Sequence, residues 1–242
     1  MPTIFLSPSL QEFNPYVDGG NEEYYMNLIA DEMIPYLRAS GIQYSRNEPS
    51  QKLSEAIAQS NAGNYDLHLA LHSNAAPEAL AGKIQGTDVY YYANSTNGKR
   101  AADIIAQNFK NIYPDPSKVK TVPTTSLAEL RRTKAPAVLI EVAYHDNPQD
   151  AQWIRDNIEN IARNLVMSLT EYFGIPFVEP ITPINGTANT TFNILNRPNL
   201  NADIIATVPQ GDRVQVVGKW EDWYVVNYGS KVGYAESKFI NT

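Results

Sequence analysis

Ala137-Val138-Leu139-Ile140-Glu141-Val142 is a short apolar run, and it predicts a buried β-strand. Tyr65-Asp66-Leu67-His68-Leu69-Ala70-Leu71-His72 is a second run of this kind. Segments with helical periodicity flank the first run, near residues 98–112 and 150–173. Strands that alternate with helices in this way are typical of a mainly parallel sheet with helices on both faces. The sequence therefore predicts an α/β fold.

The rest of the first 176 residues follows the same alternation. Residues 3–6 and 86–92 predict further strands, and residues 51–60 predict a short helix. After residue 21, apolar side chains recur at spacings of three and four until Gly41, which predicts one amphipathic helix. These side chains belong to Met26, Ile29, Ala30, Met33, Ile34 and Leu37.

The pattern changes after residue 176, where Pro176, Pro180 and Pro183 interrupt a stretch without periodicity. From about residue 185 every segment predicts a short strand, and turns such as Pro209-Gln210-Gly211-Asp212 separate them. Several short strands in under 60 residues predict a small all-β barrel. We therefore expect a first domain at 1–176, a linker at 177–184 and a second domain at 185–242.

Composition excludes some classes of function. The chain has 242 residues, of which 43% are hydrophobic and 19% charged, with a net charge of −7. This balance leaves no broad basic surface for a nucleic acid or an anionic membrane, and no stretch approaches the roughly 18 apolar residues of a membrane helix. The absence of cysteine excludes disulfides, thiolate metal sites and thiol nucleophiles. No feature of the sequence indicates an oligomeric state.

The chain has three histidines, His68, His72 and His145. His68 and His72 lie four residues apart on a predicted strand, which separates them by roughly 13 Å, so one ion cannot be held by both. His72 lies at the carboxyl end of that strand, where open α/β sheets bind ligands. His68 lies deeper and is expected to be a hydrogen-bonded core residue.

Glu141 lies inside an apolar strand. Burial of a carboxylate costs several kcal/mol unless the group is paired or used. A site that uses the lone pairs or the raised pKa of Glu141 would explain its position, and a buried salt bridge is the alternative.

Five segments, taken in order, resemble the zinc-dependent N-acetylmuramoyl-L-alanine amidases, which cleave peptidoglycan. They are the strand and loop at 3–11, Glu23-Tyr24-Tyr25-Met26-Asn27, His72-Ser73-Asn74-Ala75, Leu130-Arg131-Arg132-Thr133, and Pro136-Ala137-Val138-Leu139-Ile140-Glu141. The resemblance covers about residues 1–175. It implies a zinc cofactor and a bacterial peptidoglycan substrate.

By position, the resemblance implies that Glu23 and His72 are two of three zinc ligands and that Glu141 is the general base or acid. Glu22 is adjacent to Glu23, and the four-residue step to Asn27 favours Glu23. Zinc with three protein ligands keeps an open position for water and polarises the scissile carbonyl. The bond cleaved would join N-acetylmuramic acid to L-alanine.

One feature departs from the family pattern, in which the loop after the first strand supplies a histidine ligand. Here that loop is Ser7-Pro8-Ser9-Leu10-Gln11-Glu12 and contains no histidine. Gln11 is the predicted third ligand, with Glu12 and His145 as alternatives. A catalytically degenerate wall-binding protein that lacks a complete zinc site is the competing hypothesis.

Residues 185–242 resemble a bacterial SH3 domain, on Phe192-Asn193-Ile194-Leu195-Asn196-Arg197-Pro198, Trp223-Tyr224-Val225 and Val232-Gly233-Tyr234-Ala235. Such domains are commonly wall anchors. A wall hydrolase with this tail and no recognisable signal peptide fits a phage endolysin or a cell-lysis enzyme. We therefore expect a protein made in the cytoplasm that acts on the wall after release, or that is exported by a route the sequence does not encode.

Overall fold

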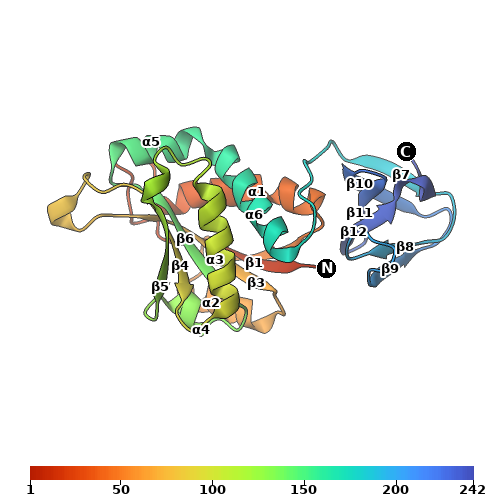
Figure 1. Cartoon of the computed structure of the whole chain (residues 1–242), viewed down its shortest axis with the longest axis horizontal. Helices are drawn as coiled ribbons and strands as arrows, with labels where there is room; N and C mark the ends of the chain where they lie inside the picture. Colours follow the sequence, from red (N-terminus) through yellow and green to blue (C-terminus); the bar gives the residue numbers. More distant parts are fainter. The chain divides into compact units, whose positions relative to one another are not determined.

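The computed structural model describes residues 1–242 (Figure 1). Up to residue 173 its helices and strands are β1 (Thr3–Pro8), α1 (Glu22–Ala39), β2 (Gln43–Arg46), α2 (Leu53–Ala62), β3 (Leu67–Asn74), β4 (Thr87–Tyr92), α3 (Thr96–Phe109), β5 (Val119–Thr124), α4 (Ala128–Arg132), β6 (Ala137–Tyr144), α5 (Pro148–Asp156) and α6 (Ile158–Phe173). Strands β7 (Ile184–Ala188), β8 (Phe192–Leu195), β9 (Ile204–Val208), β10 (Arg213–Trp220), β11 (Trp223–Tyr228), β12 (Lys231–Glu236) and β13 (Ile240–Asn241) follow.

The chain divides into two compact units. The larger unit comprises residues 4–33 and 45–172, and the smaller comprises residues 1–3, 34–44 and 173–242. No helix or strand occurs between residues 175 and 183. Each unit has its own sheet.

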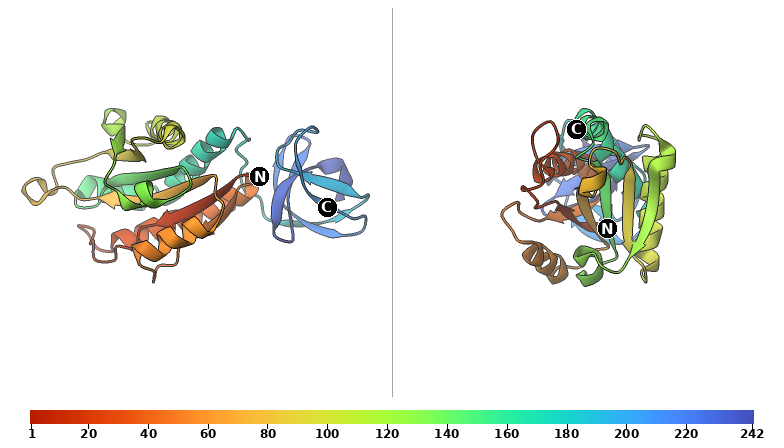
Figure 2. Two further views of the ribbon diagram at one scale, coloured as in Figure 1. Left: turned by 90° about the horizontal axis from the view of Figure 1, so that it is seen from below. Right: turned by 90° about the vertical axis from the view of Figure 1, so that its left-hand side faces the viewer.

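The larger unit contains a six-stranded sheet in the order β2-β1-β3-β6-β4-β5. Strands β1, β3 and β6 run parallel, as do β4 and β5, and the pairing of β4 with β6 is antiparallel. Figure 2 shows helices on both faces of this sheet, with α1 and α3 on opposite sides. The predicted α/β fold with a mainly parallel sheet is confirmed.

The buried strands are those whose sequences are mostly apolar. Leu67, Leu69 and Leu71 of β3 are fully buried, as are Val138 and Ile140 of β6. Helix α1 presents Met26, Ile29, Ala30 and Met33 to the interior at the spacing that predicted it. The helix predicted at 150–173 is two helices, because Asn157 leaves helical geometry and its side chain bonds to the carbonyl of Trp153.

One buried carboxylate holds three segments of the larger unit together. Asp150, near the start of α5, accepts hydrogen bonds from the backbone of Gly86 (3.0 Å) and Tyr144 (3.0 Å) and from the hydroxyl of Tyr113 (2.6 Å). Burial and this hydrogen bond raise the pKa of the Tyr113 phenol, which keeps it protonated as the donor. Asp150 therefore ties the starts of β4 and α5 to the end of β6.

Replacement of Asp150 by alanine is expected to lower the free energy of unfolding by about 3 kcal/mol. The substitution leaves three buried donors without an acceptor, and each such loss costs about 1–3 kcal/mol before relaxation. Denaturant unfolding of both variants measures the effect. The matched control is Asp156→Ala, at an exposed position of the same helix, for which a change within about 0.5 kcal/mol is expected. Equal stabilities of the two variants would contradict the assignment.

The smaller unit contains a seven-stranded antiparallel sheet in the order β13-β7-β10-β11-β12-β8-β9. Its core includes Phe192, Ile194, Val216 and Val226. The phenol of Tyr234, fully buried, donates to the carbonyl of Ser40 (2.9 Å). This sheet confirms the predicted small all-β module.

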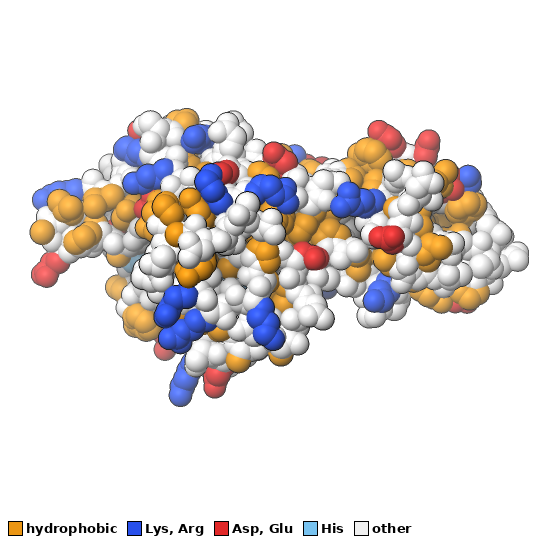
Figure 3. Space-filling model, turned by 60° about the horizontal axis from the view of Figure 1, so that its bottom comes forward, with side chains coloured by type: hydrophobic (Ala, Val, Ile, Leu, Met, Phe, Trp, Pro, Cys, Tyr) orange, Lys and Arg blue, Asp and Glu red, His pale blue; other side chains and the backbone are white.

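Two surface observations complete the description. The structure contains no helix with the length and apolar character needed to span a bilayer. On the face drawn in Figure 3, lysine and arginine side chains are spread among neutral and acidic ones.

Candidate active site

The candidate site lies at the carboxyl ends of β1 and β3 in the larger unit. His72 is near the end of β3 and is 9% exposed. The loop after β1 carries Gln11, and the first turn of α1 carries Glu22. Parallel strands place their carboxyl ends at one edge, so segments far apart in sequence meet there.

Glu22 is the carboxylate that pairs with His72. It is 1% exposed, and its Oε1 lies 2.8 Å from Nδ1 of His72. Asn14 donates to Oε2 (2.7 Å), and the backbone N–H of Ser73 approaches Oε1 at 3.4 Å. Burial alone would raise the pKa of Glu22, but the hydrogen bonds from His72 and Asn14 and the charge of His72 hold it below its usual value. Glu22 is therefore ionised.

A second carboxylate, Glu129 of α4, contacts the opposite edge of the same ring. Its Oε2 lies 3.2 Å from Nε2 of His72, and its Oε1 lies 3.1 Å from Nε2 of His68. The hydroxyl of Ser7 also donates to Oε1 (2.6 Å). Burial opposes ionisation of Glu129, but the hydrogen bonds from His68 and His72 and the charge of His72 lower its pKa well below the usual value.

His72 thus lies between two carboxylates. Burial would lower the pKa of its imidazole, but Glu129 and Glu22 together raise it well above the usual value. Both ring nitrogens then carry protons, with Nδ1 donating to Glu22 and Nε2 donating to Glu129. Binding of a metal at Nδ1 requires loss of that proton, so metal and proton compete for one position.

Glu141 lies beside His72 on the next strand. Residues 72 and 141 are directly paired in the register of β3 and β6. Atom Oε2 of Glu141 is buried without a hydrogen-bond partner. Burial is the main cause that raises the pKa of Glu141 to about 7, and the carboxylates of Glu22, Asp88 and Glu129 add to the shift while His72 opposes it. Glu141 can therefore exchange a proton near neutral pH.

The prediction that Glu23 joins His72 is corrected by this geometry, since the structure brings Glu22 there instead. The side-chain amide of Asn27 donates to Oε1 of Glu23 (3.0 Å) and to its carbonyl (2.7 Å). The four-residue step between Glu23 and Asn27 therefore reflects a contact within α1.

Gln11, the predicted third ligand, does lie beside His72. Its Nε2 is 3.3 Å from Nδ1 of the ring, and its Oε1 accepts from Asn14 (3.2 Å). Because Asn14 holds Oε1, the amide nitrogen of Gln11, and not its oxygen, faces the ring.

The two alternative third ligands lie elsewhere. Glu12 is exposed on the loop. Nδ1 of His145 lies 3.0 Å from the hydroxyl and 2.8 Å from the carbonyl oxygen of Ser73, and the ring stacks on Tyr16. His145 is buried in these contacts.

Zinc binding at this site depends on the donors that surround His72. No group of three His, Cys, Asp or Glu side chains is arranged to hold a metal ion. Glu22 and His72 present two donors of the kind that zinc prefers, and the amide of Gln11 lies next to them. Atom Oε2 of Glu141, on the strand next to His72, is a further buried oxygen without a hydrogen-bond partner. The site therefore offers zinc two ligands, Glu22 and His72, and no third one in place, because Asn14 holds the oxygen of Gln11.

A cavity of about 450 Å³ opens beside these residues. His72 and Glu129 line its inner end, with Ser7, Ser9 and Gln11 on the wall. Phe13, which is 73% exposed, and Leu53 line it further out. A polar inner end with apolar side chains around its mouth is a common arrangement in ligand sites.

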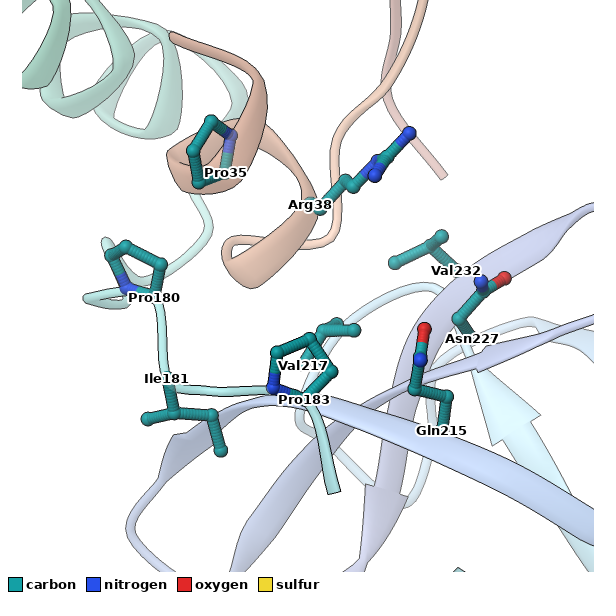
Figure 4. Close-up of a pocket in the computed structure, with 9 residues that line it drawn as sticks. All are labelled: Pro35, Arg38, Pro180, Ile181, Pro183, Gln215, Val217, Asn227 and Val232. Carbon is teal, nitrogen blue, oxygen red and sulfur yellow. The ribbon is translucent and has the colours of Figure 1, made fainter. Parts of the chain in front are cut away.

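The smaller unit has an apolar pocket of about 160 Å³, shown in Figure 4. Pro35, Pro180 and Pro183 line it, and Arg38 is its charged side chain. It contains no carboxylate or imidazole that could ligate a metal or transfer a proton near neutral pH. The chemistry is therefore assigned to the larger unit.

Glu129 was not predicted from the sequence, although a signal was present. His68 and His72 lie on the same face of one strand, and His68 is fully buried. Two imidazoles that point into one interior require a buried acceptor. Glu129, just before the apolar Leu130, is the acidic residue in a position to supply it.

Comparison with known proteins gives two family matches. Residues 13–171, more than half of the chain, match the family described as N-acetylmuramoyl-L-alanine amidase. Residues 189–241 match the bacterial SH3 domain. The chain is 26% identical over 163 residues to the N-acetylmuramoyl-L-alanine amidase LytC of Bacillus subtilis strain 168. This match covers 64% of the chain but 32% of that relative, so the chain spans about a third of the relative's length.

Solved structures share the fold. The amidase AmiC2 of Nostoc punctiforme matches with a TM-score of 0.62 and 17% identity, over 72% of this chain and 97% of that one. An N-acetylmuramoyl-L-alanine amidase from Clostridium difficile 630 matches with a TM-score of 0.63 and 18% identity, over 72% and 97%. The catalytic domain of an endolysin that targets Clostridia difficile matches with a TM-score of 0.59 and 23% identity, over 71% and 98%.

Proposed function

The chain belongs to the family of N-acetylmuramoyl-L-alanine amidases, and from this premise we propose that it hydrolyses the amide between N-acetylmuramic acid and L-alanine in bacterial peptidoglycan. The observation that carries the proposal is the meeting of Glu22 and His72 beside a carboxylate, Glu141, whose pKa is raised to about 7. Glu22 and His72 can hold a metal, and the neighbouring Glu141 can accept and return a proton.

In this proposal Glu22 and His72 would hold a zinc ion, and Gln11 would turn its amide oxygen from Asn14 to become the third ligand. The chemistry that bound zinc supplies in such sites is polarisation of a carbonyl group and activation of water. Asn14 holds Glu22 in place through Oε2, which leaves Oε1 directed at the ring of His72. The amide oxygen of Gln11 is the weakest donor of the three, so we expect weaker zinc binding than in a site with two histidines and a carboxylate.

Glu141 is the proposed general base and then the general acid. With a pKa near 7, it is partly ionised at neutral pH and can accept a proton from the attacking water. The protonated carboxyl of Glu141 can then give that proton to the nitrogen of the leaving amine as the amide C–N bond breaks. Burial of Oε2 without a partner keeps the group available for this transfer.

The SH3 domain is proposed to bind the wall and to raise the local concentration of the catalytic unit there. A hollow of about 390 Å³ in this unit is lined by Leu200, which is 70% exposed, and by the partly buried Trp223. Exposed apolar and aromatic side chains suit stacking on sugar rings or peptide. The site of action in this proposal is the bacterial cell wall, as for an endolysin or a cell-lysis enzyme.

The absence of a third strong donor favours a second candidate function. In that reading the chain is a wall-binding protein whose amidase fold has lost catalysis. The two candidates differ in whether the wall is cut, so one assay separates them.

The test incubates the full chain with purified cell walls and measures newly released L-alanine amino groups. We expect release that a chelator abolishes and that added zinc restores, because Glu22 and His72 act through the metal. Sedimentation with the walls measures binding in the same samples. Binding without release, at any zinc concentration, would support the wall-binding candidate and contradict the amidase.

A further inference from the structure

The cavity beside His72 has one lysine among its lining residues, Lys52, and no arginine. Lys52 immediately precedes α2 and is exposed. The nearby carboxylate of Glu55 accepts from the backbone N–H of Lys52 (2.7 Å). The side-chain ammonium group of Lys52 forms no ion pair. This group is therefore available to an anionic ligand in the cavity.

The inner end of the cavity carries negative charge instead. Glu129 lines this end, and its Oε2 lies 3.2 Å from Nε2 of His72. Glu22 lies on the other edge of the same ring, 2.8 Å from Nδ1. Two buried carboxylates thus surround one imidazole. A carboxylate of a ligand is repelled there and attracted at Lys52, so a ligand with one anionic end can enter in one direction only.

The walls between these two ends are apolar. Leu10 and Phe13 belong to the loop after β1, and Leu53 is the first residue of α2. The side chains of Phe13 and Leu53 are exposed. A volume of about 450 Å³ lies within the range of sites for small ligands. Two exposed apolar side chains from separate segments lose contact with water when a ligand with alkyl groups lies between them.

The two halves of the substrate in the proposed function differ in charge. The cleaved amide joins a sugar to a peptide that begins with L-alanine. The sugar half is neutral while that amide is intact, whereas the peptide half ends in a carboxylate. A neutral sugar gains nothing from the charge of a lysine, so charge complementarity selects the peptide for this cavity.

We propose that the cavity beside His72 binds the peptide half of the substrate, with alkyl groups against Phe13 and Leu53 and a carboxylate at Lys52. Lys52 is then a specificity-determining residue that selects peptides with a free carboxylate. The inference rests on the proposed function for the identity of the peptide. The glycan half extends away from this cavity.

The test titrates the nitrogen-15-labelled full chain, without added metal, with the dipeptide L-alanyl-D-glutamate and with its diamide. The diamide keeps the size of the peptide but has no carboxylate. We expect the acid to bind about two- to fivefold more tightly, as one exposed ion pair contributes. Salt at about 1 M should abolish this preference. The backbone signals of residues 10–13 and 51–53 should shift with both peptides.

Lys52→Gln is expected to bind the acid and the diamide with equal affinity. The matched control is Lys110→Gln, at an exposed position after α3 and outside the cavity, which removes the same charge from the same unit. This control should keep the preference of the wild type. Phe13→Ala should weaken the binding of both peptides to the same extent, because it removes apolar contact and no charge.

Equal affinities of the wild type for the acid and the diamide would overturn the inference. A preference that persists in Lys52→Gln, or that is lost in Lys110→Gln, would do the same. Shifts at residues 51–53 with N-acetylglucosamine, but with neither peptide, would assign the cavity to the glycan and also overturn it. The titration requires neither metal nor wall cleavage, so an inactive chain would reject the proposed function and leave this result to stand by itself.

Discussion

Replacement of Glu141 by glutamine is expected to lower wall hydrolysis by about 10²–10⁴-fold, the usual contribution of a general acid–base group. Glutamine keeps the size of the side chain but cannot take up or return a proton. Zinc affinity should change far less, because Glu141 is not among the three proposed ligands. Rates of amino-group release at saturating zinc, with zinc titrations of the same samples, measure both effects.

The same substitution is expected to stabilise the metal-free protein at alkaline pH. In the unfolded chain Glu141 ionises near 4.5, whereas burial raises its pKa in the fold to about 7. Between these values the folded state binds more protons, so its stability falls as pH rises from about 4.5 to 7. Glutamine carries no charge and avoids this loss. We expect a gain on the order of 1–2 kcal/mol at pH 8 and none at pH 4.

The control for both effects is Glu32→Gln, at an exposed position on α1. It removes the same charge from the same unit and should leave the rate unchanged and the stability within about 0.5 kcal/mol. A Glu141→Gln variant that hydrolyses walls at the wild-type rate would exclude Glu141 as the proton-transfer group. A variant less stable than the wild type at pH 8 would contradict the raised pKa.

The strands that could be predicted are those buried on both faces of the sheet, because burial on both faces requires mostly apolar residues. Strands β3 and β6 are mostly apolar because helices cover both faces of the sheet at the positions they occupy. The edge strands β2 and β5 were not predicted, since Gln43-Tyr44-Ser45-Arg46 is polar and Pro123 interrupts β5. Helix α4, with five residues, is too short to show a helical period.

The candidate site was predictable where one residue type at one strand end carries the signal. His72 was predicted on that basis, Glu141 was predicted because it is a carboxylate inside an apolar strand, and the register of β3 and β6 places the two side by side. Glu129 was missed because its role depends on a contact with residues 61 and 57 positions earlier in the chain, His68 and His72. No local pattern in the sequence records such a pairing.

Whether Glu22 or Glu23 faces His72 depends on the rotation of the first turn of α1 about the helix axis. Successive residues of an α-helix point about 100° apart, so when one of Glu22 and Glu23 faces the sheet edge the other cannot. The first residue of α1 is Glu22, and the isolated bridge between Pro15 and Asn21 fixes the chain just before it. The phase of the helix is thus set by the loop, which the apolar spacing within the helix does not reveal.

Replacement of Glu22 by glutamine is therefore expected to weaken zinc binding by at least about 100-fold, since even an indirect partner of a metal ligand contributes about 10–100-fold. Wall hydrolysis should fall with it at limiting zinc. Glu23→Gln alters a partly exposed side chain that bonds to Asn27, and a change within about twofold is expected. Chelator competition on the two variants measures the difference.

The two variants differ by one position and remove the same charge from the same turn, so each is the control for the other. General effects on the helix dipole or on net charge would weaken zinc binding equally in both. A loss confined to Glu23→Gln would mean that α1 begins one residue out of phase with the structure, with Glu23 facing His72. Because Asn14 and the backbone of Ser73 both converge on Glu22, such a rotation would break both of these hydrogen bonds and leave the buried N–H of Ser73 without this acceptor. That cost is the physical reason to expect the loss at Glu22.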